Sequence, residues 1–213
     1  MTYVITAWPR VSGLLVQHIA ITLVALLMAS AIALPLGWLL DRYRRLQAPV
    51  LGLLGILYTV PSIALMIILI PFFGLGARSV LVALVLYSQV ILVRNVLVGL
   101  SSIDATVLEV ARGIGMSPVQ IAWRVQLPLA LPVILAGLRV AAVAVIAIAA
   151  VGARFGAGGL GVLMFEGIAQ AGRFDKIVSG GVLVALLALL ANGGLLLAER
   201  AVRRTDIGIV LPV

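Results

Sequence analysis

The sequence contains no cysteine and only one histidine, His18, and just 10% of its 213 residues are charged. Without cysteine there is no disulfide framework and no thiolate metal site, and one histidine cannot build a zinc site alone. A soluble domain of this length would need far more polar surface to cover its interior. We therefore expect no metal site, and an ordinary soluble fold is excluded.

Motifs for nucleotide binding and for hydrolysis are missing as well. There is no G-x-x-x-x-G-K-[ST] phosphate loop, and the only lysine, Lys176, follows Asp175. There is no H-E-x-x-H or G-x-S-x-G motif, and no second histidine to complete a triad. Glu109 and Glu166 are too isolated in sequence to argue for paired carboxylate chemistry. We expect no catalytic residue and no bound cofactor in this chain.

Apolar side chains are what the sequence has in abundance: 64% of residues are hydrophobic and the mean hydropathy is +1.30. A helix needs about 20 apolar residues to cross the hydrocarbon core. Segments 14–40, 50–73, 79–100, 129–151 and 179–198 qualify. The net charge of +8 comes from basic residues scattered at the ends of these runs, where lipid head groups lie, so nucleic-acid binding is disfavoured. The prediction is an all-α, polytopic membrane protein with about five transmembrane helices.

The distribution of basic residues predicts how the chain is oriented. Five spans place 41–49, 101–128 and the C-terminus on one side of the membrane. That side holds eight arginines and the other side holds five basic residues, while Arg94 and Arg139 lie within spans. Basic residues favour the cytoplasm, so we expect the N-terminus outside and the C-terminus in the cytoplasm. Arg94, together with His18, is interpreted as an interfacial anchor.

The amphipathic segment 101–128 predicts a helical hairpin. Asp104 is a suitable N-cap, and the apolar residues after it follow a helical period. Gly113 and Gly115 can end this first helix, with one of them left-handed. Ser117, Pro118 and Gln120 then have the spacing of a capping box that opens a second helix. Leu127-Pro128 is expected to end that helix before the next span.

This hairpin resembles the EAA loop of ABC importer permeases, a binding-protein-dependent family. The resemblance is carried by Glu109-Val110-Ala111, by Gly115 and by Val125-Gln126-Leu127-Pro128; Val110 and Val125 depart conservatively from the family's alanine and isoleucine. It implies coupling helices at about 103–127 that dock in a groove of an ATPase subunit. The coupling residues expected on this basis are Glu109, Ala111, Arg112, Gly115, Pro118, Trp123, Leu127 and Pro128. Glu109 would make a charged hydrogen bond within the hairpin or with the partner, and Arg112, Trp123 and Arg124 are candidates for the docking face or, equally, solvated side chains.

Two further segments resemble the osmoprotectant branch of that family, which imports glycine betaine, choline and carnitine. One is the run Tyr58-Thr59-Val60-Pro61-Ser62. The other is the glycine-rich segment after the fourth span, which includes Gly156, Gly158, Gly159 and Gly161. Leu86-Tyr87-Ser88 and Val93-Arg94-Asn95 also fit the pattern. Glycine-rich segments of this kind also occur in methionine importers, so a permease for methionine or another small amino acid is the alternative. A secondary carrier or channel is less favoured, because no internal repeat is found.

The resemblance and the polar residues within the spans suggest a translocation pathway. Pro61 lacks a backbone donor and should kink or unwind the second span, with Thr59 and Ser62 satisfying the freed groups. Tyr58 and Tyr87 can present aromatic faces to a quaternary ammonium. The candidate pathway residues are Tyr58, Thr59, Pro61, Ser62, Tyr87, Asn95 and Arg139. A structural kink at Pro61 is an equal alternative, and snorkelling to the cytoplasmic head groups is the favoured interpretation of Arg139.

The resemblance also implies the type I (MetI-like) importer fold and a set of partners. One permease domain is expected over 1–205, with a short C-terminal tail over 206–213, in the plasma (inner) membrane of a bacterium or archaeon. The expected partners are two ATPase subunits, a second copy of the permease or a homologous permease, and an extracytoplasmic substrate-binding protein. The outer segment 152–177 could form a short helix that serves as a lid, a docking ledge or a surface-lying element. The alanines of the fourth span are expected to pack against the second permease.

Overall fold

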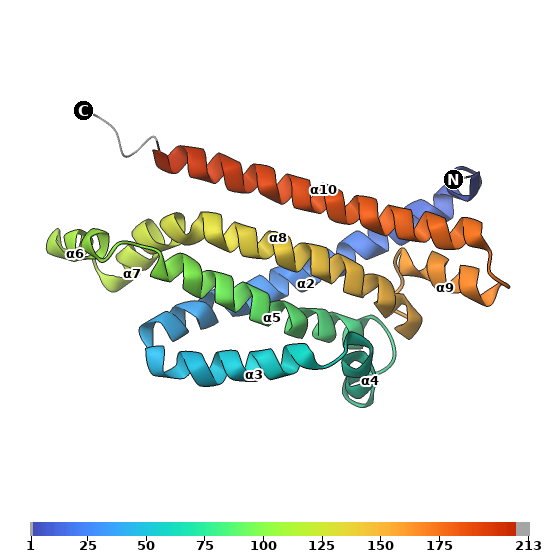
Figure 1. Cartoon of the computed structure of the whole chain (residues 1–213), viewed down its shortest axis with the longest axis horizontal. Coiled ribbons are helices and arrows are strands. Elements are labelled where there is room, and N and C mark those ends of the chain that lie inside the picture. The colour runs from blue at the N-terminus through green and yellow to red at the C-terminus, as the bar shows by residue number, and fades with distance from the viewer. Residues whose placement is uncertain (1, 208–213) are drawn as a thin grey trace.

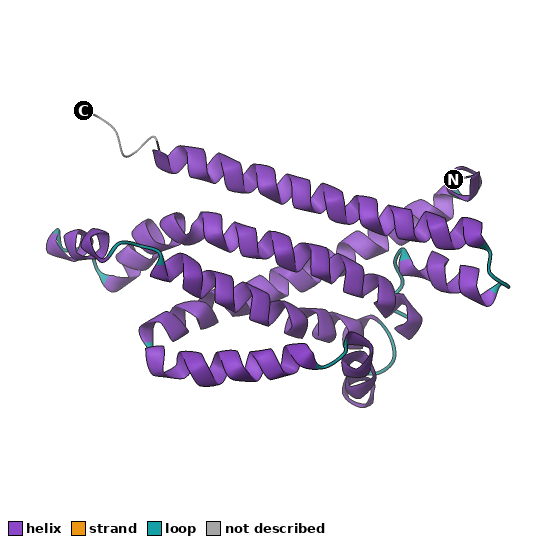
Figure 2. Ribbon diagram, viewed as in Figure 1, coloured by secondary structure: helices purple, strands orange, loops and turns teal. Residues whose placement is uncertain are grey.

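The computed structural model describes residues 2–207, so most of the tail expected over 206–213 lies outside it. Within these residues every regular element is helical (Figure 2), which confirms the all-α prediction. The α-helices are α1 (Thr2–Thr6), α2 (Trp8–Arg42), α3 (Gln47–Thr59), α4 (Ser62–Phe73), α5 (Ala77–Ser101), α6 (Ala105–Gly113), α7 (Pro118–Ile121), α8 (Leu127–Gly152), α9 (Gly161–Ala169) and α10 (Phe174–Ile207). Two 3-10 turns, η1 (Arg44–Leu46) and η3 (Ala153–Phe155), and one π turn, η2 (Ala122–Gln126), connect them.

Four helical segments of the described chain are long and apolar enough to cross a membrane: Trp8–Arg42, Ala77–Ser101, Pro118–Phe155 and Phe174–Arg203. A fifth span exists only if the pair Arg44–Thr59 and Ser62–Phe73, which is bent by 99°, is counted as one. The expected second span is therefore two helices meeting almost at a right angle. In Figure 1, α4 accordingly runs across the direction of α3 and α5.

Helix α5 lies between α2 and α8 and supplies much of the buried core. Small residues bring these three helices close together. Ala25, Ala29 and Ala33 of α2 are fully buried, and a Cβ on Gly137 of α8 would overlap Asn95 of α5. Lipid gives helices no hydrophobic reason to associate, so close van der Waals packing at small residues holds such a bundle together.

The alanines of α8 do not occupy the position expected from the sequence. Ala141, Ala142, Ala149 and Ala150 are buried inside this chain. Residues that already pack against their own chain are unavailable to line a contact with a second permease, so that part of the prediction is wrong for these four. Ala147, in contrast, is exposed and remains free for such a contact.

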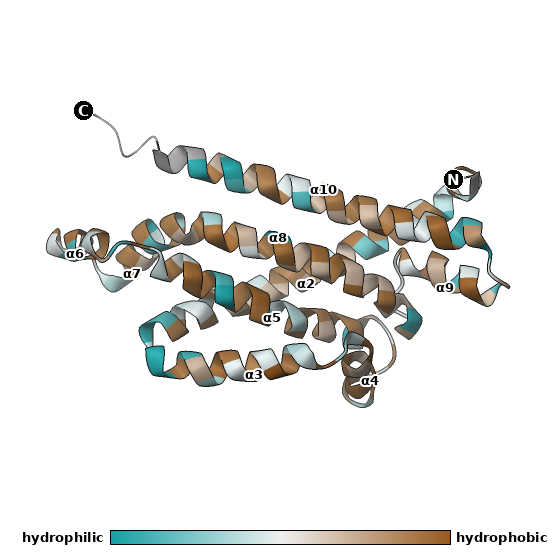
Figure 3. Ribbon diagram, viewed as in Figure 1, coloured by the Kyte–Doolittle hydropathy of each residue, from teal (hydrophilic) through white to brown (hydrophobic). Residues whose placement is uncertain are grey.

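The two ends of the bundle carry different elements (Figure 1). Helices α6 and α7 project at the end where α10 also finishes, and α9 lies with the N-terminus at the opposite end. Hydrophilic residues gather toward both ends and the middle of the long helices is mostly hydrophobic (Figure 3). This arrangement fits the alternation used in the sequence analysis, which places 41–49, 101–128 and the C-terminus together.

Candidate functional site

The hairpin begins with the short helix α6, which is capped as its sequence predicts. Asp104 has extended backbone angles, and its carboxylate accepts a hydrogen bond from the backbone N–H of Thr106 at 2.8 Å. This hydrogen bond to the charged form holds the pKa of Asp104 below its ordinary value. The cap satisfies one of the donors that every helix leaves free in its first turn.

Gly115 ends α6 in a Schellman motif. Its φ of +84° lies in the left-handed region that glycine adopts at least cost. The N–H of Gly115 donates to the carbonyl of Arg112 at 3.0 Å, and the N–H of Met116 donates to that of Ala111 at 3.1 Å. Gly113 is the last residue of α6. The sequence left open which of the two glycines is left-handed, and the structure assigns that role to Gly115.

The second helix of the hairpin is continuous with the fourth span. Ser117 and Gln120 form the predicted capping box, in which the Ser117 N–H donates to Gln120 Oε1 at 2.8 Å and the Gln120 N–H donates to Ser117 Oγ at 3.3 Å. Helix α7 then passes through the π turn η2 directly into α8. The expectation that Leu127-Pro128 ends the helix is wrong, because Pro128 lies in the first turn of α8 and the wider π turn precedes it. Helix α7 thus runs into α8 with no loop between them.

The hairpin presents a mixed apolar and basic surface. Its exposed apolar side chains include Ile114 (74% exposed) and Trp123 (68%). Arg112 and Arg124 are also exposed, whereas Ala111 is buried against the rest of the hairpin. Glu109 is exposed and has no ion-pair or side-chain hydrogen-bond partner among the side chains that the structure describes. A contact of Glu109 with the partner subunit stays a prediction.

The predicted break at Pro61 is present, and Tyr87 stabilises it. Helix α3 ends at Thr59, and Val60 and Pro61 are both extended. The hydroxyl of Tyr87, on α5, donates a hydrogen bond to the carbonyl of Val60. Tyr58 packs edge-on against the Tyr87 ring, with 5.7 Å between ring centroids and 69° between ring planes.

Of the two hydroxyls expected to satisfy the break, Thr59 does so: it donates at 2.7 Å to the carbonyl of Ile56, which the end of α3 leaves without a backbone donor because the Val60 N–H bonds to Leu57. Ser62 makes no side-chain hydrogen bond among the described residues. Thr59 therefore acts as the sequence predicts, and the Tyr87 hydroxyl, in place of Ser62, supplies a second donor at the break.

Asn95 and Arg139 both make contacts inside the bundle. The Asn95 amide donates to Ile91 of its own helix at 2.8 Å, and its side chain faces Gly137 of α8. Arg139 lies 3.7 Å from Glu199 of α10, and Glu199 also pairs with Arg203 at 3.0 Å. Glu199 is nearly buried, and the sequence analysis did not identify it. Glu199 thus gives Arg139 a counter-charge, but at 3.7 Å the contact is not a hydrogen bond, and Arg139 Nε and Glu199 Oε2 have no hydrogen-bond partner among the described residues. Snorkelling of Arg139 stays a prediction.

At the other end of the bundle, the glycine-rich segment is held on α2. Gly156, Gly158 and Gly159 all have positive φ angles between 76° and 81°. A Cβ on Gly159 would lie 2.8 Å from His18 Nδ1, and one on Gly161 would overlap the carbonyl oxygen of Ala150. The left-handed backbone favours glycine at the first three of these positions, and close contacts exclude a side chain at Gly159 and Gly161.

His18 is the residue that holds this segment most directly. It is fully buried, its Nδ1 accepts the N–H of Leu160 at 3.3 Å, and its Nε2 lies 3.1 Å from the carbonyl of Ile146. Because Nδ1 accepts, Nε2 carries the proton and donates to Ile146. Gln17 adds a second link by accepting the N–H of Gly159 at 3.2 Å. The interpretation of His18 as an interfacial anchor is therefore wrong: it joins α2, α8 and the glycine-rich segment. The sequence did contain a signal for such a role, because Gln17-His18 is a polar pair within an otherwise apolar span.

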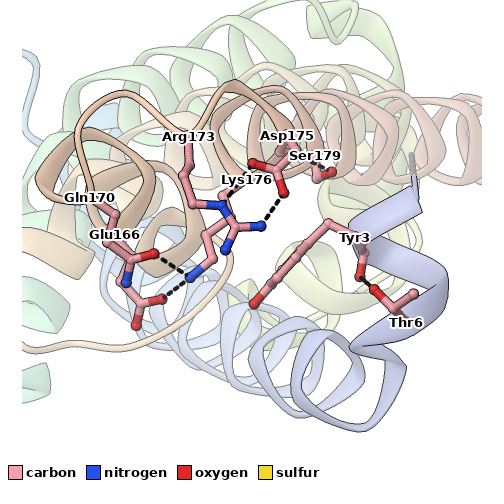
Figure 4. Close-up of polar contacts among 8 residues, drawn as sticks. All are labelled: Tyr3, Thr6, Glu166, Gln170, Arg173, Asp175, Lys176 and Ser179. Carbon is pink, nitrogen blue, oxygen red and sulfur yellow. Dashed lines mark hydrogen bonds and ion pairs between the residues drawn. The ribbon is translucent and has the colours of Figure 1, made fainter.

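The predicted outer helix exists as α9, and a polar cluster fixes it to α10 (Figure 4). Lys176 of α10 donates at 2.9 Å to Gln170, the residue that follows α9, and lies 3.4 Å from Glu166 of α9. Glu166 also pairs with Arg10 of α2. The ring of Tyr3 lies 5.2 Å from the Lys176 ammonium, so α1 joins the cluster through a cation–π contact. The first two helices of the chain, α1 and α2, thus meet α9 and α10 at this end.

Comparison with known proteins gives matches over most of the chain. A model of the family described as "Binding-protein-dependent transport system inner membrane component" matches residues 23–204. The carnitine transport permease protein OpuCB of Listeria monocytogenes is 38% identical over 83% of this chain and 80% of its own. The choline transport system permease protein OpuBB of Bacillus subtilis is 36% identical over 86% and 84%. The osmoprotectant import permease protein OsmW of Salmonella typhimurium is 38% identical over 85% and 86%.

Solved structures show the same fold. An inward-facing structure of the MetNI methionine ABC transporter superposes with a TM-score of 0.84 at 25% identity, covering 92% of this chain and 98% of that one. A structure of an amino acid ABC transporter with histidines superposes with a TM-score of 0.74 at 16% identity, which shows the fold alone. The type I (MetI-like) importer fold and a multi-pass inner-membrane location follow. This chain belongs to the family of binding-protein-dependent transport system inner membrane components.

Proposed function

We propose that this chain is the membrane-spanning permease subunit of an ATP-driven ABC importer for quaternary-ammonium compatible solutes such as glycine betaine, choline and carnitine. The observation that carries the substrate class is the similarity, at 36–38% identity over more than four-fifths of the chain, to permeases named for carnitine, choline and osmoprotectants. The aromatic pair at the helix break supports it, because Tyr58 is 47% exposed and can offer its ring to a passing ammonium group.

The proposed route for solute lies between two permease copies. One chain has four or five spans, too few to enclose a gated pathway comfortably, so a second copy or a homologous permease completes it. The broken pair α3 and α4 is the element best suited to line the route, since non-helical backbone at membrane depth is tolerated where it is buried in protein or lines a cavity. In this proposal an extracytoplasmic binding protein delivers solute at the end where α9 and the glycine-rich segment lie.

Coupling to ATP is assigned to the hairpin α6–α7. Two ATPase subunits would hold ATP and Mg and would each receive one hairpin through its exposed Ile114, Trp123, Arg112 and Arg124. Because α7 continues through η2 into α8, closure of the ATPases pushes directly on a transmembrane helix. The unpaired Glu109 is available for a charge-assisted hydrogen bond to the ATPase.

This proposal places the N-terminus outside and the C-terminus in the cytoplasm. The chain lacks cysteine, so single cysteines report the orientation directly. Arg173→Cys, at the α9 end, should react with an impermeant thiol reagent in intact cells, and Arg45→Cys, at the hairpin end, should react only after permeabilisation. Labelling of Arg45→Cys from outside would reverse the orientation and remove the coupling assignment.

A methionine or small amino acid importer is the second candidate, favoured by the superposition on MetNI. The deciding experiment is uptake by the reconstituted transporter with its own binding protein, with labelled glycine betaine, choline, carnitine and methionine in competition. Uptake of a quaternary ammonium compound that methionine does not compete for supports the first candidate. Methionine uptake with no competition from any quaternary ammonium compound would overturn the substrate class and leave the family unchanged.

A further inference from the structure

A pocket of about 410 Å³ opens at the hairpin end of the bundle, away from the helix break and from the hairpin itself. Its lining comes from the end of α2, from η1, from the start of α3 and from the last two turns of α5. The lining residues are Asp41, Arg44, Gln47, Leu51, Arg94, Leu97, Val98 and Ser101. Its volume is in the range of small-molecule sites, about 300–1,000 Å³.

The pocket contains positive charge that the chain leaves uncompensated. Among the side chains that the structure describes, no carboxylate lies within ion-pairing distance of Arg44 or Arg94. Asp41 is the one acidic residue in the lining, so the two guanidinium groups leave a net charge of +1. Arg42 and Arg45 flank the pocket without lining it and add to the local positive field. The polar end of the pocket therefore suits an anion that accepts hydrogen bonds from arginine.

The rest of the lining is apolar and extends toward the membrane interior. Leu51, Leu97 and Val98 form this part, and Val98 is 56% exposed on the outer surface of α5. Arg94 lies about 10 Å along the helix axis before the end of α5, at about 1.5 Å per residue, whereas Arg44 lies in the connecting turn. A ligand that fits both parts has an anionic head and an apolar body and approaches from within the bilayer.

We propose that this pocket binds the head group of an anionic phospholipid, with Arg44 and Arg94 on the phosphate and the glycerol and upper acyl chain on Leu51, Leu97 and Val98. Basic pockets between transmembrane helices are the kind of site that holds such head groups. The proposal requires a membrane-spanning chain and is independent of the transported solute.

The test is native mass spectrometry of the whole transporter, permease with its ATPase subunits, after delipidation in detergent and titration with phosphatidylglycerol, phosphatidylcholine or inorganic phosphate. The wild-type complex should retain phosphatidylglycerol in preference to phosphatidylcholine. Replacing both pocket arginines in R44Q/R94Q should weaken this retention about tenfold or more, since each basic residue near a surface contributes to binding of anionic lipid. The control R42Q/R45Q removes two arginines that neighbour Arg44 in sequence but do not line the pocket. At about 0.3 M salt, charges that do not touch the lipid act on it only through a screened field, so this control should change little.

Each other outcome counts against the proposal. Equal loss in both double variants would show a general basic surface in place of a site, and unchanged retention in R44Q/R94Q would show that the pocket is not involved. Displacement of the lipid by millimolar inorganic phosphate would assign the pocket to a soluble anion. If R44Q/R94Q fails to assemble, R44K/R94K keeps the charge and removes the planar two-point contact, and it should show intermediate retention.

Discussion

Replacing Gly115 by alanine is the sharpest test of the coupling hairpin. A Cβ at this position meets no atom within 4 Å, so the substitution adds no steric clash. Its cost arises from the backbone alone, because a φ of +84° is a left-handed conformation that disfavours any residue with a Cβ by about 1–2 kcal/mol. That free energy corresponds to roughly a 5–30-fold shift away from the observed hairpin conformation.

The matched control is Gly113→Ala, two residues away. Gly113 also has nothing within 4 Å of a new Cβ, but it lies within α6, where alanine is favoured over glycine by about 0.5–1 kcal/mol. The assay is ATP hydrolysis by the reconstituted transporter with its binding protein and solute, together with co-purification of the ATPase with the permease. Gly115→Ala should reduce stimulated hydrolysis several-fold, Gly113→Ala should leave it unchanged, and Gly115→Asn should retain more activity than alanine, since asparagine tolerates the left-handed region better. Full activity of Gly115→Ala, or equal loss at both positions, would refute the reasoning that this Schellman turn sets the docking geometry.

Three further changes test other parts of the bundle. Tyr87→Phe leaves the Val60 carbonyl without its donor and should lower stability by about 1–3 kcal/mol in a detergent melting assay. Tyr58→Phe, whose hydroxyl has no hydrogen-bond partner among the described residues, should change stability little. Glu199→Gln leaves Arg139 without its counter-charge and should destabilise the protein, by less than the roughly 3–5 kcal/mol typical of a fully buried pair; failure of the swap R139E/E199R to recover any stability would count against the pairing. The depressed pKa of Asp104 means that its capping contribution is complete above the ordinary aspartate pKa, about 3.9, and is lost as pH falls through the lower folded value. The hydrogen-exchange protection factors of α6, which are corrected for the pH dependence of the intrinsic exchange rate, should therefore fall on acidification below that value, and Asp104→Asn should remove this dependence.

Local signals in the sequence predicted the local features of the structure. Asp104, Gly115 and the Ser117–Gln120 capping box act within a few residues of themselves, so their geometry follows from backbone chemistry that any chain shares. The break at Pro61 is of the same kind. The continuity of α7 with α8 was missed because a Leu-Pro pair normally marks a helix boundary, and the π turn that accommodates it leaves no recognised sequence pattern.

Contacts between distant segments were not predictable in the same way. The Tyr87 hydroxyl reaches a carbonyl 27 residues away, and His18 accepts an N–H 142 residues away. Glu199 of α10 pairs with Arg139 of the preceding span, α8. A polar residue in an apolar span signals that it has a partner, because an unsatisfied polar group in hydrocarbon costs several kcal/mol. The sequence does not identify that partner, which depends on which helix faces are adjacent.

The same polar contacts show how the two ends of the bundle are joined mechanically. Helix α8 receives the hairpin at one end through η2, and at the other end it accepts the His18 hydrogen bond at Ile146 and the close contact of Gly161 at Ala150. Arg139, between these points, ties α8 to Glu199 of α10, and α10 in turn holds α9 through Lys176. Each of these links is a hydrogen bond, an ion pair or a glycine contact with little freedom to stretch. A push on the hairpin that shifts α8 along its axis must therefore also displace the glycine-rich segment and α9, or break one of these specific contacts.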